Sequence, residues 1–121
     1  MFNLGVLAEQ AGDLKGEKRW HELAAAAGDS DAMFNLGVLA EQAGDLKGAK
    51  RWYELAADAG NSGAMFNLGA LAQQAEDLKG AKRWYELAAA AGNSDAMFNL
   101  GVLAQQAGDL KGAKRWFERA K

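Results

Sequence analysis

Apolar residues recur along the chain at intervals of three and four, which is the spacing of one face of an α-helix. Within residues 33–64, one such stripe is formed by Met33, Leu36, Ala40 and Ala43, and a second by Leu46, Ala49, Tyr53 and Ala56. The pattern predicts two amphipathic helices of about 12–14 residues each, joined by a short turn.

The residues between the stripes are of the types that end and begin helices. Gly44 closes the first helix, because glycine adopts the left-handed conformation of a helix C-terminus without strain. Asp45 follows as an N-cap, and its charge suits the positive end of the next helix. Gly60 ends the second helix, and Asn61 with Ser62 caps the helix after it. The prediction is therefore a helical hairpin with tight turns.

This hairpin is repeated along the chain. The segment Met-Phe-Asn-Leu-Gly begins at Met1, Met33, Met65 and Met97, a period of 32 residues. The first and second units agree at 27 of 32 positions, and so do the second and third. A fixed period of this length is typical of a solenoid. We therefore predict an all-α fold, a single array over residues 1–121 with eight helices in four antiparallel hairpins. Its units are 1–32, 33–64, 65–96 and 97–121.

Some glycines lie inside the predicted helices. Each first helix contains one, at Gly5, Gly37, Gly69 and Gly101. The missing side chain predicts a close approach of the paired helix, at Ala49, Ala81 and Ala113. Another glycine lies in the first turn of each second helix, for example Gly48, and the sequence suggests no packing role for it. Glu76 replaces the helix-ending glycine of the third unit, which predicts a non-glycine residue in the left-handed region.

Composition and charge exclude several kinds of chemistry. The chain has no cysteine, no proline, one histidine and a formal net charge of −2. Without cysteine there is no disulfide framework, thiolate zinc site or cysteine nucleophile. The charge argues against general nucleic-acid affinity. No apolar run approaches the ~20 residues of a membrane span. The N-terminus lacks the basic segment of a secretory signal, so we expect no membrane association and a cytoplasmic location.

The sequence contains no readable catalytic constellation. Ser30, Ser62 and Ser94 lie at helix caps without a nearby histidine. Glu17 and His21 are one turn apart, where the other units carry an alanine and an aromatic residue, and two ligands on one helix face make a poor metal site. We expect no enzyme activity, no metal and no cofactor. We expect a local Glu17–His21 pair and a first hairpin that is looser, or packed at a different angle, than the others.

All 14 basic residues lie on the second helices, for example Lys47, Lys50 and Arg51. Beside Trp52 they form a ridge that superficially suits RNA, whose phosphates pair with cations and whose bases stack on aromatic rings. Glu54, one turn away, can pair with these cations. A solvated outer face is therefore the simpler interpretation, and RNA binding is the weaker alternative.

The repeat resembles two related families. Leu36-Gly37 on the first helix, Gly44-Asp45 at the turn, and Ala49, Trp52-Tyr53 and Ala56 on the second helix are similar to a tetratricopeptide repeat. The end of each unit is closer to Sel-like repeats, as in the run Trp-Tyr-Glu-Leu-Ala-Ala and the later Ala-Gly-Asn-Ser-Asp-Ala-Met. The period is 32 rather than about 34, the proline usual near the end of tetratricopeptide units is missing, and the turn lacks the extra residues of Sel-like units. These departures leave the superhelix pitch open.

The resemblance implies a right-handed superhelix whose first helices line a concave groove for an extended peptide or a partner's helix. The residues expected to line that groove are Phe2, Asn3, Val6, Phe34, Asn35, Val38, Glu41, Gln42, Phe66, Asn67, Gln73, Gln74, Phe98, Asn99 and Gln105. The asparagines would hydrogen-bond a peptide backbone and the phenylalanines would act as apolar anchors. Alternatively, the asparagines are polar filler and the phenylalanines pack between first helices. Because this face has no lysine or arginine, the ligand would be neutral or basic and partly apolar.

The last unit differs from the others at its end. Arg119 and Lys121 replace a leucine and an alanine, such as Leu55 and Ala57, that we expect to face the next hairpin. Four apolar residues of the final helix would stay uncovered: Leu110, Ala113, Trp116 and Phe117. Of these, Leu110, Trp116 and Phe117 are the residues expected to associate. We therefore expect self-association through the terminal hairpins, as a homodimer first.

The favoured function is a non-catalytic scaffold that binds a peptide or protein segment in the groove. The alternative is an engineered or recently duplicated repeat protein that has no evolved ligand and associates with itself.

Overall fold

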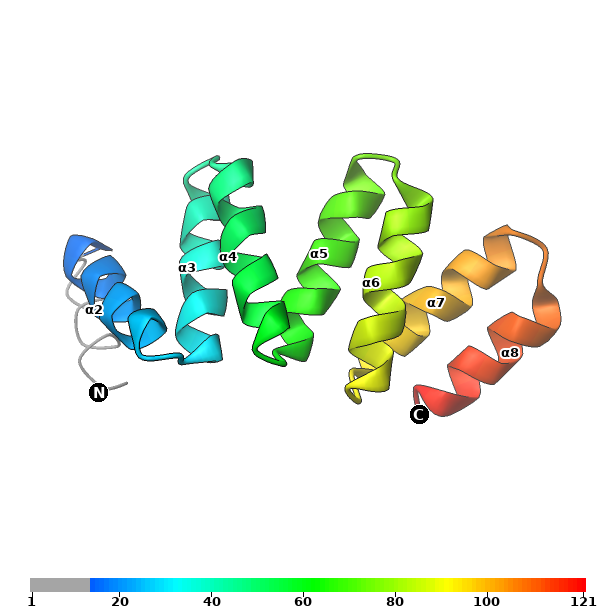
Figure 1. Ribbon diagram of the computed structural model, residues 1–121. Coiled ribbons are helices and arrows are strands. Elements are labelled where there is room, and N and C mark those ends of the chain that lie inside the picture. The colour runs from blue at the N-terminus through cyan, green and yellow to red at the C-terminus, as the bar shows by residue number, and fades with distance from the viewer. Residues whose placement is uncertain (1–13) are drawn as a thin grey trace. The chain divides into compact units, whose positions relative to one another are not determined.

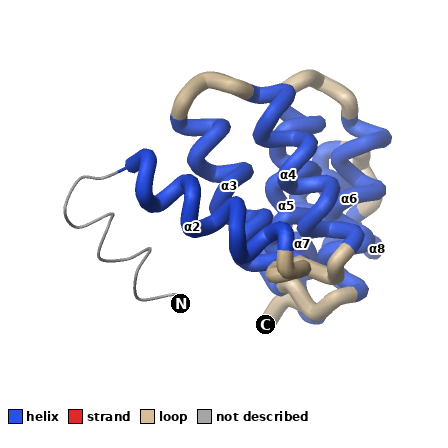
Figure 2. The backbone as a smooth tube through the Cα atoms, turned by 60° about the vertical axis from the view of Figure 1, so that its left-hand side comes forward, coloured by secondary structure: helices blue, strands red, loops and turns tan. Residues whose placement is uncertain are grey.

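A computed structural model of the protein describes residues 14–121, and every element in that range is an α-helix (Figures 1 and 2). The helices are α2 (Leu14–Ala26), α3 (Ser30–Gln42), α4 (Leu46–Asp58), α5 (Ser62–Gln74), α6 (Leu78–Ala90), α7 (Ser94–Gln106) and α8 (Leu110–Arg119). The all-α prediction is confirmed. The predicted eighth helix, at the N-terminus, lies outside the described residues.

The chain divides into two compact units, Met1–Asn61 and Ser62–Lys121. In the first unit, α3 packs against both α2 and α4. In the second unit, α6 packs against α5 and α7, and α7 packs against α8. The pairs α3–α4, α5–α6 and α7–α8 are antiparallel hairpins, as the repeat pattern predicts (Figure 1).

The turn inside each hairpin depends on one aspartate that serves both helices. The backbone N–H of Asp45 donates to the carbonyl of Ala40 over 2.8 Å and that of Gly44 to the carbonyl of Glu41 over 3.0 Å, which closes α3. This pair of bonds is a Schellman motif, and Gly44 has the positive φ, 80°, that it requires. The carboxylate of Asp45 then accepts the N–H of Gly48 at 2.9 Å and caps α4. Both predicted roles, glycine stop and aspartate cap, are confirmed.

The same cap explains the glycine for which the sequence suggests no role. A Cβ added to Gly48 would collide with the capping carboxylate of Asp45. The turns before α6 and α8 repeat the arrangement, where Asp77 accepts from Gly80 and Asp109 from Gly112. Glycine therefore makes room for the cap, and this explains why it recurs at that position.

The core is built mainly from small residues around a few large ones. Ala49, Tyr53 and Ala56 are fully buried, which confirms most of the second predicted stripe. In the first stripe only Leu36 is buried, Met33 and Ala40 are half-buried, and the placement of Ala43 is wrong because it is exposed at the end of α3. The placement of Leu46 in a stripe is wrong, because its side chain is 56 % exposed. Leu46 is the first residue of α4 and follows directly on the turn, beyond the last residue of α3.

The prediction that both Leu55 and Ala57 face the next hairpin is half wrong. Ala57 is buried, but Leu55 is 49 % exposed, and Leu23 and Leu87 at the equivalent positions are exposed as well. Two residues on an α-helix are separated by about 200° around its axis. The leucine and the alanine therefore point to nearly opposite sides, and only the alanine faces the core.

Glu76 occupies the left-handed region, as predicted, with a φ of 63°. Because its Cβ crowds the backbone there, Glu76→Gly should raise the free energy of unfolding by about 1 kcal/mol. The matched control is Gly44→Glu, which places the same residue at the equivalent turn and should lower stability by a similar amount. Urea denaturation measures both changes. If exchanging the residues in either direction leaves the midpoint unchanged, the turn does not store this strain.

Candidate functional site

In the hairpins α3–α4, α5–α6 and α7–α8, an aromatic ring of the second helix lies against a glycine of the first helix. A Cβ added to Gly69 of α5 would come within 2.6 Å of the ring of Tyr85 of α6. Gly37 meets the ring of Tyr53 in the same way, and Gly101 meets that of Phe117. The close approach predicted at these glycines is confirmed, but its partner is not the alanine named from the sequence. The ring one turn later fills the space, because Ala81 has no side chain long enough to reach it.

The tyrosine hydroxyl reaches the residue one turn beyond the glycine. The Tyr85 hydroxyl donates to Oε1 of Gln73 at 2.8 Å, and the Tyr53 hydroxyl donates to Oε1 of Glu41 at 2.7 Å. Residues i and i+4 share one helix face, so a ring that crosses Gly69 ends beside Gln73. Two residues expected to bind a ligand therefore already hold a core tyrosine.

Asn99 of α7 adds a third partner to this tyrosine. Burial raises the pKa of Tyr85 above its ordinary value, while a side-chain hydrogen bond from Asn99 acts in the opposite direction. The folded state thus holds the phenolic proton more tightly than the unfolded chain does. The contribution of Tyr85 to stability is complete below about pH 10 and is lost as the pH rises through the raised pKa.

The phenylalanines of the first helices pack on the same rings. The ring centroids are 5.7 Å apart for Phe34 and Tyr53, and 5.5 Å apart for Phe66 and Tyr85. The corresponding pair in the last hairpin, Phe98 with Phe117, is separated by 5.3 Å. All three pairs are tilted, a favourable arrangement for aromatic rings. Each phenylalanine is thus anchored by the second helix of its own hairpin.

These contacts leave different amounts of each predicted site residue in solvent. Phe34, Asn35, Val38, Phe66, Asn67, Gln73 and Asn99 are half-buried, whereas Glu41, Gln42, Gln74, Phe98 and Gln105 are exposed. Phe2, Asn3 and Val6 lie outside the described residues. In the second unit the structure brings Phe66, Gln73 and Asn99 together around Tyr85. This tyrosine was not predicted to be the centre, although an aromatic residue recurs at the same spacing after Gly37 and Gly101.

The residues expected to support self-association are only partly uncovered. Leu110 is 68 % exposed, while Trp116 and Phe117 are half-buried. The expectation that Ala113 stays uncovered is wrong, because Ala113 is buried within the hairpin, at 4 % exposure. The guanidinium of Arg119 lies 4.5 Å from the ring centre of Trp116, a cation–π contact that covers part of the indole. That copies of the chain associate through these residues stays a prediction.

The expectations for the first hairpin fall partly outside the described region. His21 is buried, at 8 % exposure, but the side chain of Glu17 is not described, so neither their pairing nor the looseness of the hairpin is tested. Within residues 14–121, no three His, Cys, Asp or Glu side chains gather as metal ligands. No helix of that same range is long and apolar enough to cross a membrane.

Comparison with known proteins points to helical repeats throughout. The tetratricopeptide repeat family matches residues 30–59 and, through a second family description, residues 94–119. A Sel1 repeat protein from Oxalobacter formigenes is 26 % identical, with a TM-score of 0.84. The protein c5321, a protective antigen of uropathogenic Escherichia coli strains that displays an SLR fold, is 31 % identical, with a TM-score of 0.82. No curated protein sequence matches the chain.

The two similarities cover nearly all of this chain but only part of the other proteins. Both similarities cover 98 % of this chain, but the chain spans only 55 % of the Oxalobacter protein and 29 % of the Escherichia coli antigen. MamA protein, at 19 % identity and a TM-score of 0.68, shares the fold over 98 % of this chain and 68 % of its own length.

A reciprocal pair of substitutions tests the contribution of the Tyr85 hydroxyl to stability. Tyr85→Phe removes the donor to Gln73 and should lower the free energy of unfolding by about 1 kcal/mol. Phe117→Tyr adds a hydroxyl at the equivalent position, where Gln105 lies one turn beyond Gly101, and should raise stability by a smaller amount because Gln105 is exposed. Chemical denaturation measures both. Equal stabilities for Tyr85→Phe and the unmodified protein would contradict the role of the hydroxyl.

Proposed function

Because this chain belongs to the tetratricopeptide and Sel-like repeat superfamily, we propose that it is a non-catalytic scaffold that binds a peptide or protein segment on its first helices. Repeats of this superfamily generally mediate protein–protein interactions, and the proteins that contain them are typically non-enzymatic. The proposed binding face in the second unit is formed by α5 and α7.

The observation that carries this proposal is an exposed aromatic ring that packs on an aromatic ring of the second helix. Phe98 is 54 % exposed, yet its ring packs on Phe117 at 5.3 Å. Phe66 occupies the same position on α5 and packs on Tyr85. A ring that is already fixed loses little conformational entropy on binding, so it serves well as an apolar anchor.

The polar groups around these anchors define the chemistry of the ligand. Gln74 and Gln105 are exposed, and an amide can both donate to and accept from a peptide backbone. The described first helices contain no lysine or arginine, and Asp95 adds a negative charge at the start of α7. The ligand that suits this face is a neutral or basic peptide with apolar side chains.

A displayed peptide library panned against the whole protein tests this function. We expect enrichment of neutral or basic peptides with apolar residues, and at least a tenfold loss of affinity, about 1.4 kcal/mol, in Phe98→Ala. The matched control is Leu87→Ala, because Leu87 is similarly exposed, at 52 %, but lies on a second helix. Circular dichroism establishes that both variants fold.

Three outcomes would contradict the proposal. Enriched peptides that bind Phe98→Ala and the unmodified protein equally would place the interaction elsewhere. No enrichment on a fully folded protein would favour the alternative, a repeat protein without an evolved ligand. Salt-dependent binding of RNA instead of peptides would favour the basic second helices.

A further inference from the structure

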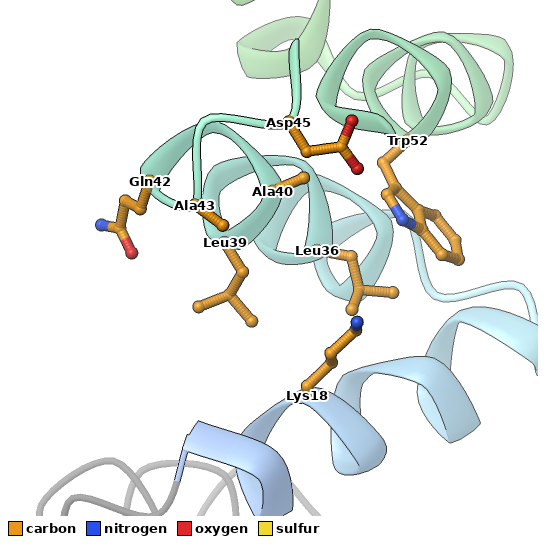
Figure 3. A pocket seen from close by; sticks show the side chains of 8 residues that line it. All are labelled: Lys18, Leu36, Leu39, Ala40, Gln42, Ala43, Asp45 and Trp52. Atoms are coloured by element: carbon orange, nitrogen blue, oxygen red, sulfur yellow. The ribbon is translucent and has the colours of Figure 1, made fainter. Parts of the chain in front are cut away.

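A cavity occurs at the same place in both compact units. In the first unit it is lined by residues of α2, α3 and α4, is partly open to solvent and has a volume of about 360 Å³ (Figure 3). In the second it is lined by residues of α6, α7 and α8 and has a volume of about 370 Å³. Leu36, Leu39 and Trp52 line the first, and Leu100, Leu103 and Trp116, 64 residues later, line the second. These volumes lie at the lower end of the range of ligand sites, about 300–1,000 Å³.

Most residues of α7 that line the cavity face away from Phe98 of the proposed peptide face, although Gln42, expected in the peptide groove, lines the cavity of the first unit. On α7, Leu103 and Ala107 line it, whereas Phe98 and Val102 belong to the other side of the helix. Since each residue turns the helix by about 100°, Phe98 and Ala107 are separated by half a turn. Figure 3 shows the equivalent arrangement in the first unit, where Leu36 and Leu39 of α3 face the same space as Lys18 of α2.

Short side chains keep this space open. Ala104 and Ala107 supply only methyl groups to the wall, while Leu100, at 2 % exposure, belongs to the core. The indole of Trp116 lines the cavity from α8. The interior is therefore mostly apolar, with aliphatic groups and one aromatic ring, and suits a bulky apolar side chain.

The rim of the cavity carries an excess of positive charge. Lys79 and Lys82 of α6 line it and are exposed, and no carboxylate within the described part of the chain pairs with either of them. The single acidic residue there, Asp109, already accepts the N–H of Gly112 as the cap of α8. Lys18 and Asp45 reproduce this arrangement in the first unit.

We propose that this cavity is a second docking site, for an acidic segment of a partner protein. One bulky apolar side chain of that segment enters between Leu103 and Trp116, and its flanking carboxylates face Lys79 and Lys82. The charge preference is opposite to that of the first-helix face, so the two surfaces select different ligands. This inference goes beyond the proposed function and does not depend on it.

A blocked synthetic peptide, acetyl-Glu-Glu-Leu-Phe-Glu-Glu-amide, tests the site directly on the whole protein. The indole N–H resonance of Trp116, assigned with a Trp116→Phe variant, reports occupancy of this cavity alone. We expect a saturable shift of that resonance. Replacing Leu-Phe by Ala-Ala, or the glutamates by lysines, should weaken the apparent affinity at least tenfold.

Three protein variants separate the contributions. Lys79→Gln with Lys82→Gln should lower the affinity at least tenfold. The matched control is Lys111→Gln with Lys114→Gln, at the same two positions of α8. These lysines do not line the cavity, so the control should preserve the affinity. Ala104→Leu fills the cavity without changing its charge and should abolish the shift.

Several results would overturn the docking site. These are an unchanged Trp116 resonance at millimolar peptide, equal binding of the Ala-Ala peptide, or equal loss in the two lysine pairs. A shift produced by octanoate but not by the peptide would also overturn it, in favour of a small amphiphile. Phe98→Ala should leave this titration unchanged, so a failure here is distinct from a failure of the first-helix face.

Discussion

The contact on which each hairpin depends is an aromatic ring seated on a glycine of the paired helix. In the second unit this is Tyr85 on Gly69, with the fully buried Ala81 and Ala88 one turn to either side. The glycine has no Cβ, so the ring can lie against the backbone of α5. The alanines are short, so α6 can follow the ring closely. A side chain at Gly69, or a longer one at Ala81 or Ala88, would separate the two helices, because densely packed interiors have no free volume to absorb an added atom.

The surface of the molecule follows from this core contact. The ring of Tyr85 lies across Gly69, where its hydroxyl donates to Gln73 and the ring of Phe66 packs against it. The phenylalanines and part of the polar residues of the first helices are thus fixed by the second helices. Trp116 and the alanines of α7 leave an apolar cavity near Lys79 and Lys82. One repeated packing unit therefore carries two surfaces of different charge.

Local rules were sufficient to predict the helices and turns. Helical periodicity, the stop at Gly44, the cap at Asp45 and the positive φ at Glu76 each depend on a few neighbouring residues. The features that were missed depend on where a side chain points. The capping carboxylate beside Gly48 and the exposure of Leu55 follow from directions within one turn and one helix, whereas the partner of Gly69 follows from how two helices pack together. The proposed peptide face came from the family resemblance, and no local pattern predicted the cavity.

A double-mutant cycle at Gly69 and Tyr85 tests the central contact most directly. Gly69→Ala alone should lower the free energy of unfolding by about 1–3 kcal/mol through overpacking, although alanine is the better helix former. In a Tyr85→Ala background the ring is gone, and the same substitution should raise stability by up to about 1 kcal/mol. Urea denaturation of the four proteins gives the coupling free energy. An effect of Gly69→Ala that is the same in both backgrounds would show that ring and glycine do not depend on one another.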